Sequence, residues 1–240
     1  MTRERPDRLW QLGGVIVAAA VLVAIAVAVF TGGSTPVLRP GRPVPHTAAA
    51  QALFAGVPEQ GPALGAPGAP VTLVEFADLQ CPVCAAFARD TLPTLVRREV
   101  RPGRLRIVFA PLTFIGADSG HGAQMALAAG EQDRLWPFVD LFFANQREEN
   151  SGYVDDAFLT ALAQATAGLD PARALAARTQ PAVARDLDSA SAEAKRLHVD
   201  STPSFALSKT GSTPVSFSPA DLQPGAFEAA IDGLAGTGSR

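Results

Sequence analysis

Two cysteines stand three positions apart, Cys81 and Cys84, and they are the residues of this chain best suited to chemistry. A strand-like run, 71–77, precedes them, and a helix-like run, 82–100, follows. This order places Cys81 at the beginning of a helix, where unpaired backbone N–H groups and the helix dipole stabilise a thiolate. Cys84 follows one turn later on the same side, within bonding reach. The pair is therefore expected to cycle between a dithiol and a disulfide.

Two other uses of a C-x-x-C pair remain open at this point. A zinc site needs four ligands, and the other soft ligands, His46, His121 and His198, are scattered without a zinc-binding spacing. A purely structural disulfide is also possible, but so short a loop removes little entropy from the unfolded chain. The order strand, C-x-x-C, helix favours redox chemistry, and no metal site is predicted.

The N-terminus indicates where this chemistry takes place. Residues 12–30 contain no charge, and Arg3, Arg5 and Arg8 precede them. As a helix this segment would be long enough to cross the roughly 30 Å hydrocarbon core of a membrane. We expect an uncleaved single-pass transmembrane anchor at 12–30, with residues 1–11 cytoplasmic. A cleaved signal is the alternative, with a weak cleavage site at 26–28. Either way, the bulk of the chain is expected outside the cytoplasmic membrane, in a compartment that permits disulfides.

The remaining chain divides into a linker and one domain. Gly and Pro are frequent after residue 31, so residues 31–62 are predicted to be a linker, although Leu53, Phe54 and Val57 can add a short element. Residues 63–236 are predicted to form a single domain of ordinary size. The net charge of −3, with no basic block, argues against nucleic acid as a partner.

Hydrophobic patterning predicts the elements of that domain. Residues 71–77 and 105–110 are expected to be buried strands joined by the helix 82–100, which Pro93 should kink. A helical block follows, and its last helix carries apolar residues at spacings of three and four. The expected N-caps of the block are Asp118 or Ser119, Asp155 and Asp170. Two strands, 203–208 and 214–217, and a closing helix, 224–234, complete the order β-α-β, helical insert, β-β-α.

This order resembles a thioredoxin fold that carries the helical insertion of the DsbA family. The resemblance covers about residues 69–231. Three stretches carry it: Val74-Glu75-Phe76-Ala77-Asp78-Leu79-Gln80-Cys81-Pro82-Val83-Cys84, Arg134 to Gln146, and Leu197-His-Val-Asp-Ser-Thr-Pro-Ser-Phe205. It implies an α/β fold with a central mixed β-sheet and an all-helical insertion at about 117–198, while the uncharged span 12–30 predicts the transmembrane helix in front of this domain.

The resemblance also implies a role for each residue of the motif. Cys81 would exchange with a partner, and Cys84 would close the disulfide or resolve the mixed disulfide. Pro82 suits the first helical turn because its missing N–H would be unpaired there anyway. Strongly oxidising relatives often carry His where Val83 stands. Because Val83 cannot donate a proton or a charge to the thiolate, a milder oxidant is expected.

Three further residues take roles from the resemblance. Glu75 is expected to be a buried acid that exchanges protons with Cys84, against the alternative of a strand carboxylate facing solvent. Thr202-Pro203 is expected to be a cis peptide facing the disulfide and available to an extended substrate. Asp78 can be exposed, and no catalytic role is assigned to it.

Several aromatic and apolar residues remain as candidates for a peptide groove. Leu112 and Phe114 are weak candidates. The aromatic residues of the insert, Trp136, Phe138, Phe142 and Phe143, are expected to belong to its core instead.

The function predicted from these residues is an extracytoplasmic thiol:disulfide oxidoreductase that forms disulfides in exported proteins. No cofactor is expected in the chain. The expected partners are exported proteins with free thiols and a quinone-linked membrane reoxidase of the DsbB or vitamin K epoxide reductase type. A reductase or isomerase of the envelope, and a non-catalytic binding module, are the alternatives.

Overall fold

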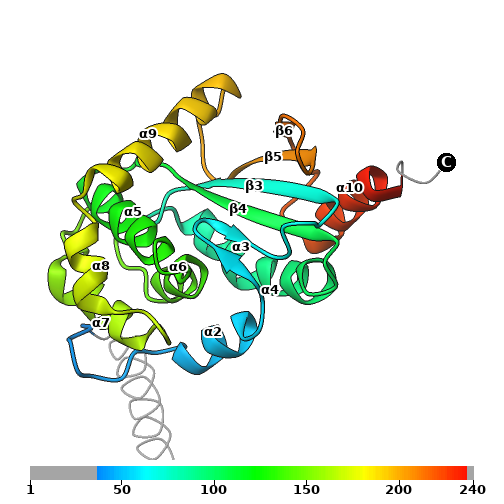
Figure 1. Ribbon diagram of the computed structural model, residues 1–240. Helices are drawn as coiled ribbons and strands as arrows, with labels where there is room; N and C mark the ends of the chain where they lie inside the picture. Colours follow the sequence, from blue (N-terminus) through cyan, green and yellow to red (C-terminus); the bar gives the residue numbers. More distant parts are fainter. Residues whose placement is uncertain (1–36, 237–240) are drawn as a thin grey trace, which may run out of the picture. The chain divides into compact units, whose positions relative to one another are not determined.

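The computed structural model describes residues 37–236 of the chain (Figure 1). The expected cytoplasmic N-terminus, 1–11, and the expected anchor, 12–30, lie outside the described residues. Within residues 37–236, no helix combines the length and the apolar character needed to cross a membrane.

A six-stranded mixed sheet forms the centre of the described domain, in the order β1-β2-β4-β3-β5-β6. Strand β3 runs parallel to β4 and antiparallel to β5, as the βαβ prediction and the expected mixed sheet require. Its seven residues are nearly all buried, which is typical of a strand covered on both faces. The strands are β1 (Glu59–Gln60), β2 (Ala63–Leu64), β3 (Val71–Ala77), β4 (Leu105–Pro111), β5 (Ser204–Lys209) and β6 (Val215–Phe217).

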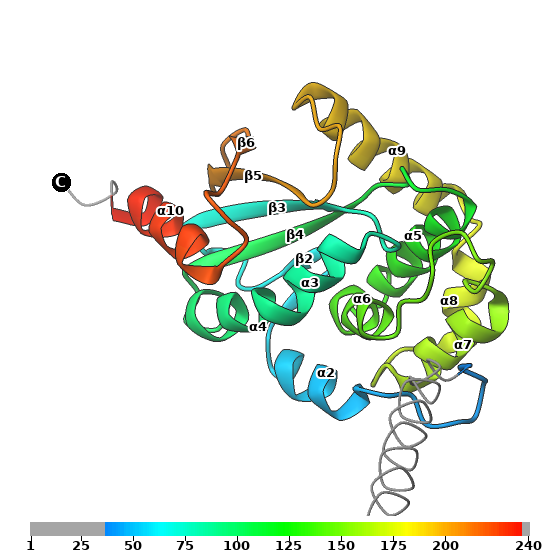
Figure 2. The same cartoon turned by 180° about the vertical axis from the view of Figure 1, so that it is seen from behind.

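Ten helical segments surround this sheet in the described residues (Figures 1 and 2). Five of them, α5 to α9, lie between β4 and β5 in the sequence and form the helical insert that was predicted. The segments are α2 (Thr47–Phe54), α3 (Pro82–Asp90), α4 (Leu92–Leu95), a π-helical turn η1 (Val96–Val100), α5 (Ala117–Gly130), α6 (Leu135–Ala144), α7 (Asp156–Ala165), α8 (Pro171–Ala177), α9 (Pro181–Arg196) and α10 (Pro224–Gly236).

Alternation along β3 divides its side chains between two hydrophobic clusters. Val74 and Phe76 pack with Ala194 of α9 on one face of the sheet. On the other face, Glu75 lies directly opposite Phe205 of β5. The ring of Phe205 contacts Phe87 of α3 and Phe227 of α10, with ring centroids 5.0 and 4.9 Å apart. Glu75 therefore projects into the face that α3 covers.

The sequence correctly predicted the N-termini of the two helices that a single nearby aspartate caps. Asp155 accepts from the N–H of Phe158, and Asp170 accepts from two N–H groups at the beginning of α8. The prediction for α5 was wrong, because the helix begins at Ala117 and Gly116 is its N-cap. Asp118 lies in the first turn instead, where its carboxylate accepts from the N–H of Gly152 across the insert.

The long helix expected over 82–100 is broken into three pieces. Helix α3 ends at Asp90, α4 begins at Leu92 with Pro93 in its first turn, and η1 follows. Because proline has no N–H to donate and crowds the carbonyl four residues earlier, Pro93 interrupts the helix instead of only bending it.

Ordered structure begins before residue 63, within the stretch expected to be a linker. Helix α2 and strand β1 lie inside 31–62, and the side chains of Ala50 and Phe54 are buried. The guanidinium of Arg101 donates to the carbonyls of Ala52 and Leu53, which α2 leaves without helical partners at its end. Long-range packing therefore orders a segment whose Gly and Pro content suggested a tether.

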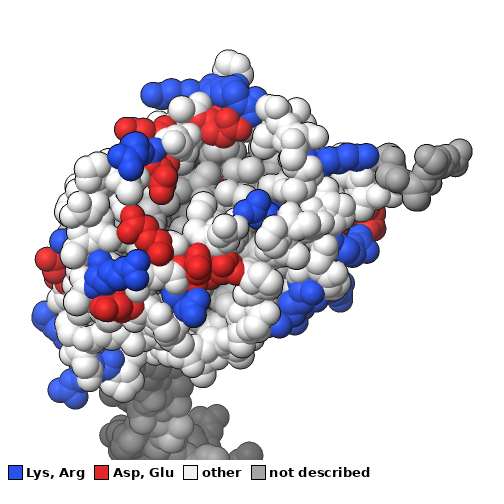
Figure 3. All heavy atoms as spheres, in the orientation of Figure 1, with Lys and Arg blue, Asp and Glu red and all other residues white. Residues whose placement is uncertain are grey.

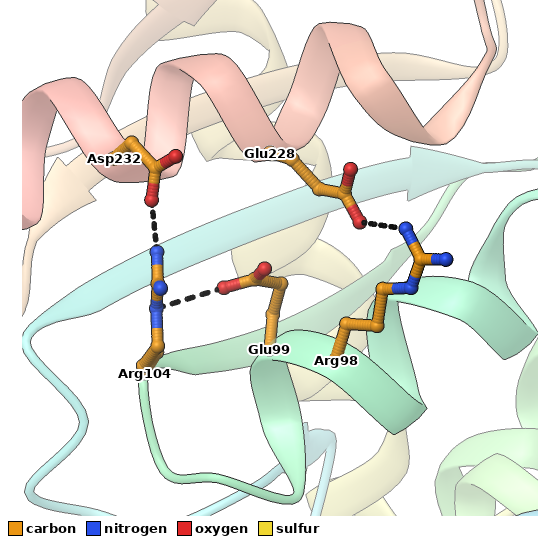
Figure 4. Close-up of polar contacts among 5 residues, drawn as sticks. All are labelled: Arg98, Glu99, Arg104, Glu228 and Asp232. Carbon is orange, nitrogen blue, oxygen red and sulfur yellow. Dashed lines mark hydrogen bonds and ion pairs between the residues drawn. The ribbon is translucent and has the colours of Figure 1, made fainter.

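Ion pairs join α10 to the end of η1 and the turn before β4 (Figure 4). Arg104 pairs with Glu99 at 3.0 Å and also with Asp232, and Arg98 pairs with Glu228 at 3.3 Å. Because three of these five side chains, Arg98, Arg104 and Asp232, are well exposed, we expect the pairs to orient α10 more than to stabilise it. On the face shown in Figure 3, acidic and basic side chains are interspersed.

Candidate redox site

The two cysteines occupy the first turn of α3, and both are free thiols in this structure. Cys81 is the N-cap residue, Pro82 begins the helix, and the N–H of Cys84 donates to the sulfur of Cys81 at 3.4 Å. The sequence correctly placed both cysteines at a helix N-terminus. The arrangement holds a dithiol whose two sulfurs belong to different environments.

The surroundings of Cys81 favour its thiolate. Its pKa falls from 9.0 to about 6, first because of a hydrogen bond from the side chain of Cys84. Burial opposes this change, while a hydrogen bond with the Thr202 side chain and the N–H groups of Cys84 and Val83 add to it. When the thiol is protonated, it donates to the carbonyl of Thr202 at 3.3 Å. Near neutral pH, Cys81 is therefore mostly ionised.

Cys84 differs sharply from its neighbour. Cys84 is 0% exposed, whereas Cys81 is 6% exposed, and burial raises the pKa of the Cys84 thiol. The neighbouring charges of Cys81 and Glu75 raise it further. Cys81 is only slightly exposed, but Val83 beside it is 47% exposed and marks the surface through which a partner can approach. Only one of the two sulfurs is thus both ionised and close to solvent.

Glu75 is buried in the middle of β3, beneath α3. It is 2% exposed, and burial raises the pKa of its carboxyl from 4.5 to about 8. Its charge acts on the Cys84 thiol, so the two groups are electrostatically coupled. The structure places the acid where a proton exchange with Cys84 is feasible, and that role stays a prediction.

The segment before β5 faces the cysteines. The Thr202-Pro203 peptide bond is cis, as the resemblance implied, and the Thr202 carbonyl contacts Cys81. A groove of about 580 Å³ runs along this segment and is lined by Val83, by residues 197–205 and by residues 216–219, 221 and 222. A partner bound there would lie beside the Thr202-Pro203 turn, whose Thr202 carbonyl contacts the reactive sulfur.

The other groove candidates lie elsewhere. Leu112 is only 3% exposed and Phe114 is 53% exposed, but neither lines this groove. Four aromatic residues of α6 are buried, so their assignment to the core is confirmed: Trp136, Phe138, Phe142 and Phe143. Within the part of the chain that the structure describes, no three His, Cys, Asp or Glu residues are grouped so as to hold a metal ion.

Sequence reasoning missed the polar residues that hold the turn before α3. Asp78 is 0% exposed and accepts from the N–H groups of Gln80 and Ile115. Gln80, at 1% exposure, hydrogen-bonds across to the helical insert. The only sequence signal for these contacts was the presence of two polar residues, Asp78 and Gln80, within the three positions before Cys81.

The model of a family described as thioredoxin matches residues 58–219, about two thirds of the chain. The chain belongs to the thioredoxin family. Among known relatives, the probable disulfide bond formation protein D of Bacillus cereus is 33% identical over 101 residues, which cover 41% of this chain and 47% of that protein. The disulfide bond formation protein D of Bacillus subtilis is 31% identical over 116 residues, which cover 46% of this chain and 50% of that protein. The chain thus spans about half the length of the curated relatives it matches.

Solved structures show the same fold at lower sequence identity. Oxidised BdbD from Bacillus subtilis superposes with a TM-score of 0.64 and 21% identity, covering 75% of this chain and 98% of that one. DsbA from Chlamydia trachomatis superposes with a TM-score of 0.62 and 17% identity, covering 75% of this chain and 93% of that one. The fold is therefore the DsbA-like form of the thioredoxin fold, with its helical insertion.

Proposed function

We propose that this protein is a thiol:disulfide oxidoreductase that forms disulfides in exported proteins through Cys81 and Cys84. The observation that carries the proposal is the asymmetry of the pair, since the pKa of Cys81 is lowered and that of Cys84 is raised. A stabilised thiolate favours the reduced enzyme, which makes its disulfide an oxidant. The relatives named as disulfide bond formation proteins support the same direction of electron flow, from the substrate thiols to the enzyme.

In the first step, a substrate thiolate attacks the Cys81 sulfur of the oxidised enzyme. The Cys81–Cys84 bond breaks, a bond between the substrate sulfur and Cys81 forms, and Cys84 leaves with the electron pair. Because the pKa of Cys84 is raised, this sulfur needs a proton at once. Glu75 is protonated near neutral pH, with a pKa of about 8, and is the group that supplies it.

In the second step, another thiolate of the substrate attacks the substrate sulfur of the mixed disulfide. The new disulfide forms in the substrate, and Cys81 leaves as a thiolate. A thiolate with a pKa of about 6 is a good leaving group, so release is fast. The substrate loses two electrons and the enzyme keeps them as the dithiol. Pro82 and Val83 tune this step, and Val83, which carries no charge, keeps the oxidising power moderate.

The groove beside Thr202 and Pro203 is the proposed binding site for the extended substrate segment. The proposed location is the extracytoplasmic side of the cell membrane, with residues 12–30 as a single-pass anchor. A quinone-linked membrane protein of the DsbB or vitamin K epoxide reductase type would then reoxidise the dithiol. If the anchor is correct, membrane fractions contain the full-length chain, whereas a soluble form that begins after Ala28 would show a cleaved signal.

The test of function is the redox equilibrium of the pair with glutathione, together with trapping in cells. We expect a potential well above that of thioredoxin, about −270 mV, and an oxidised pair in intact cells. Cys84→Ala should accumulate mixed disulfides with exported proteins, and Cys81→Ala should accumulate almost none. A thioredoxin-like potential with a reduced pair in cells would assign the protein to reductases or isomerases instead.

A further inference from the structure

The turn between β3 and α3 is held by side chains of the helical insert, far away in the sequence. The side-chain amide of Gln146, just after α6, donates to the carbonyl of Leu79 at 2.6 Å and to the carbonyl of Cys81 at 3.1 Å. One amide group thus fixes two peptide units on either side of Gln80.

Gln80 itself points into the insert and uses its whole amide there. Its nitrogen donates to the hydroxyl of Ser119 at 2.9 Å and to the side-chain oxygen of Asn150 at 3.3 Å. Its oxygen accepts from the backbone N–H of Asn150 at 2.7 Å. Because Gln80 is 1% exposed, these bonds replace those that water would make. The turn is therefore fastened to the insert at both ends.

The bond to the Cys81 carbonyl matters most for the chemistry. A carbonyl has two lone pairs, and here one accepts from the N–H of Ala85 in the first turn of α3 while the other accepts from Gln146. Together they fix the Cys81 peptide with φ −68° and ψ 120°, the extended conformation of an N-cap residue. In that conformation the sulfur lies over the first N–H groups of the helix, and Cys84 N–H reaches it at 3.4 Å.

We propose that Gln146 is a positioning residue for the reactive thiol, which it serves by holding the Cys81 carbonyl so that the N–H groups at the beginning of α3 stay directed at the Cys81 sulfur. The helical insert then has a task in the redox site besides covering it. The inference rests on the proposed function, since it names a residue that prepares the same site for exchange.

A Gln that merely ties a loop would affect stability but not the ionisation of Cys81. The chain offers a matched control for this difference. Gln132, also in the insert, donates to the carbonyl of Asp170 at 3.2 Å and accepts from the N–H of Asp170 at 3.0 Å. Like Gln146, it makes two hydrogen bonds to backbone groups, but none to the turn before α3.

The experiment compares Gln146→Met with Gln132→Met in the full chain, reduced before measurement. The pH dependence of iodoacetamide alkylation of Cys81 reports the thiolate. We expect Gln146→Met to move the midpoint upward by about one pH unit, which makes alkylation at pH 6 about fivefold slower, and Gln132→Met to leave it unchanged. Should Gln146→Met not fold, Gln146→Asn serves in its place, since its shorter amide cannot span both carbonyls.

An unchanged midpoint in a folded Gln146 variant, or an equal shift in both the Gln146 and Gln132 variants, would overturn the proposal. Alkylation needs neither a protein substrate nor an oxidant. The result is therefore independent of the direction of electron flow, and a failure here is distinguishable from a failure of the oxidase assignment.

Discussion

The hydrogen bond from the Cys84 side chain is the largest cause of the low pKa of Cys81, and its removal is a direct test of the electrostatics of the site. Cys84→Ala deletes this donor, whereas Cys84→Ser keeps a hydroxyl at the same position. A hydrogen bond to a charged group contributes about 1.5–3 kcal/mol, which corresponds to about one to two pKa units. We therefore expect the pKa of Cys81 to rise from about 6 to about 7–8 in the alanine variant and to stay near 6 in the serine variant.

The assay follows thiolate absorbance near 240 nm, or the rate of alkylation, across pH 4 to 10. Both variants retain Cys81 as their only cysteine, so the signal has a single source. At pH 7 the ionised fraction should fall from about 90% to between about 10% and 50% when the donor is lost. The midpoint of the titration is the quantity to compare, because intrinsic thiolate reactivity itself changes with pKa.

Equal midpoints near pH 6 in the alanine and serine variants would refute this reasoning. The thiolate would then be held by the backbone N–H groups of the helix terminus alone, with no measurable contribution from the second thiol. Equal midpoints near 8.5 in both variants would also contradict it, since the hydroxyl would have failed to replace the thiol.

Three further substitutions test the fold and the buried acid. Because burial raises the pKa of Glu75 from 4.5 to about 8, the parent protein should lose stability as the pH rises through this interval, whereas Glu75→Gln should not. Urea unfolding of the parent should therefore give a free energy of unfolding that is lower at pH 9 than at pH 5 by at most about 5 kcal/mol. Phe227→Ala, at a residue 1% exposed among three other phenylalanine rings, should cost about 3–5 kcal/mol in unfolding free energy, while Phe114→Ala, at 53% exposure, should cost less than about 0.5 kcal/mol; similar losses would contradict the packing. Asp155→Ala removes the cap of α7 and should lower stability by about 1 kcal/mol, a loss that Asp155→Ser should largely avoid.

The sequence determined those features whose causes are local. The run 71–77, apolar except for Thr72 and Glu75, predicted the bounds of β3, because a strand covered on both faces needs a mostly apolar stretch. Asp155 and Asp170 marked the beginnings of α7 and α8, since a cap acts within three residues of itself. The spacing of Cys81 and Cys84, with Pro82 next to the first, likewise placed the pair on the first turn of a helix.

The tertiary structure decided everything that depends on partners distant in the sequence. It ordered α2 through the contact with Arg101, and it buried Asp78 by giving its carboxylate the N–H of Ile115. It also brought Gln146 to the carbonyl of Cys81 across 65 residues. Neither hydrophobic periodicity nor secondary-structure propensity predicts such contacts, because each contact exists only after the sheet and the insert have packed. The sequence thus determined which sulfur begins the helix, and the packing of the insert decided how that sulfur is held.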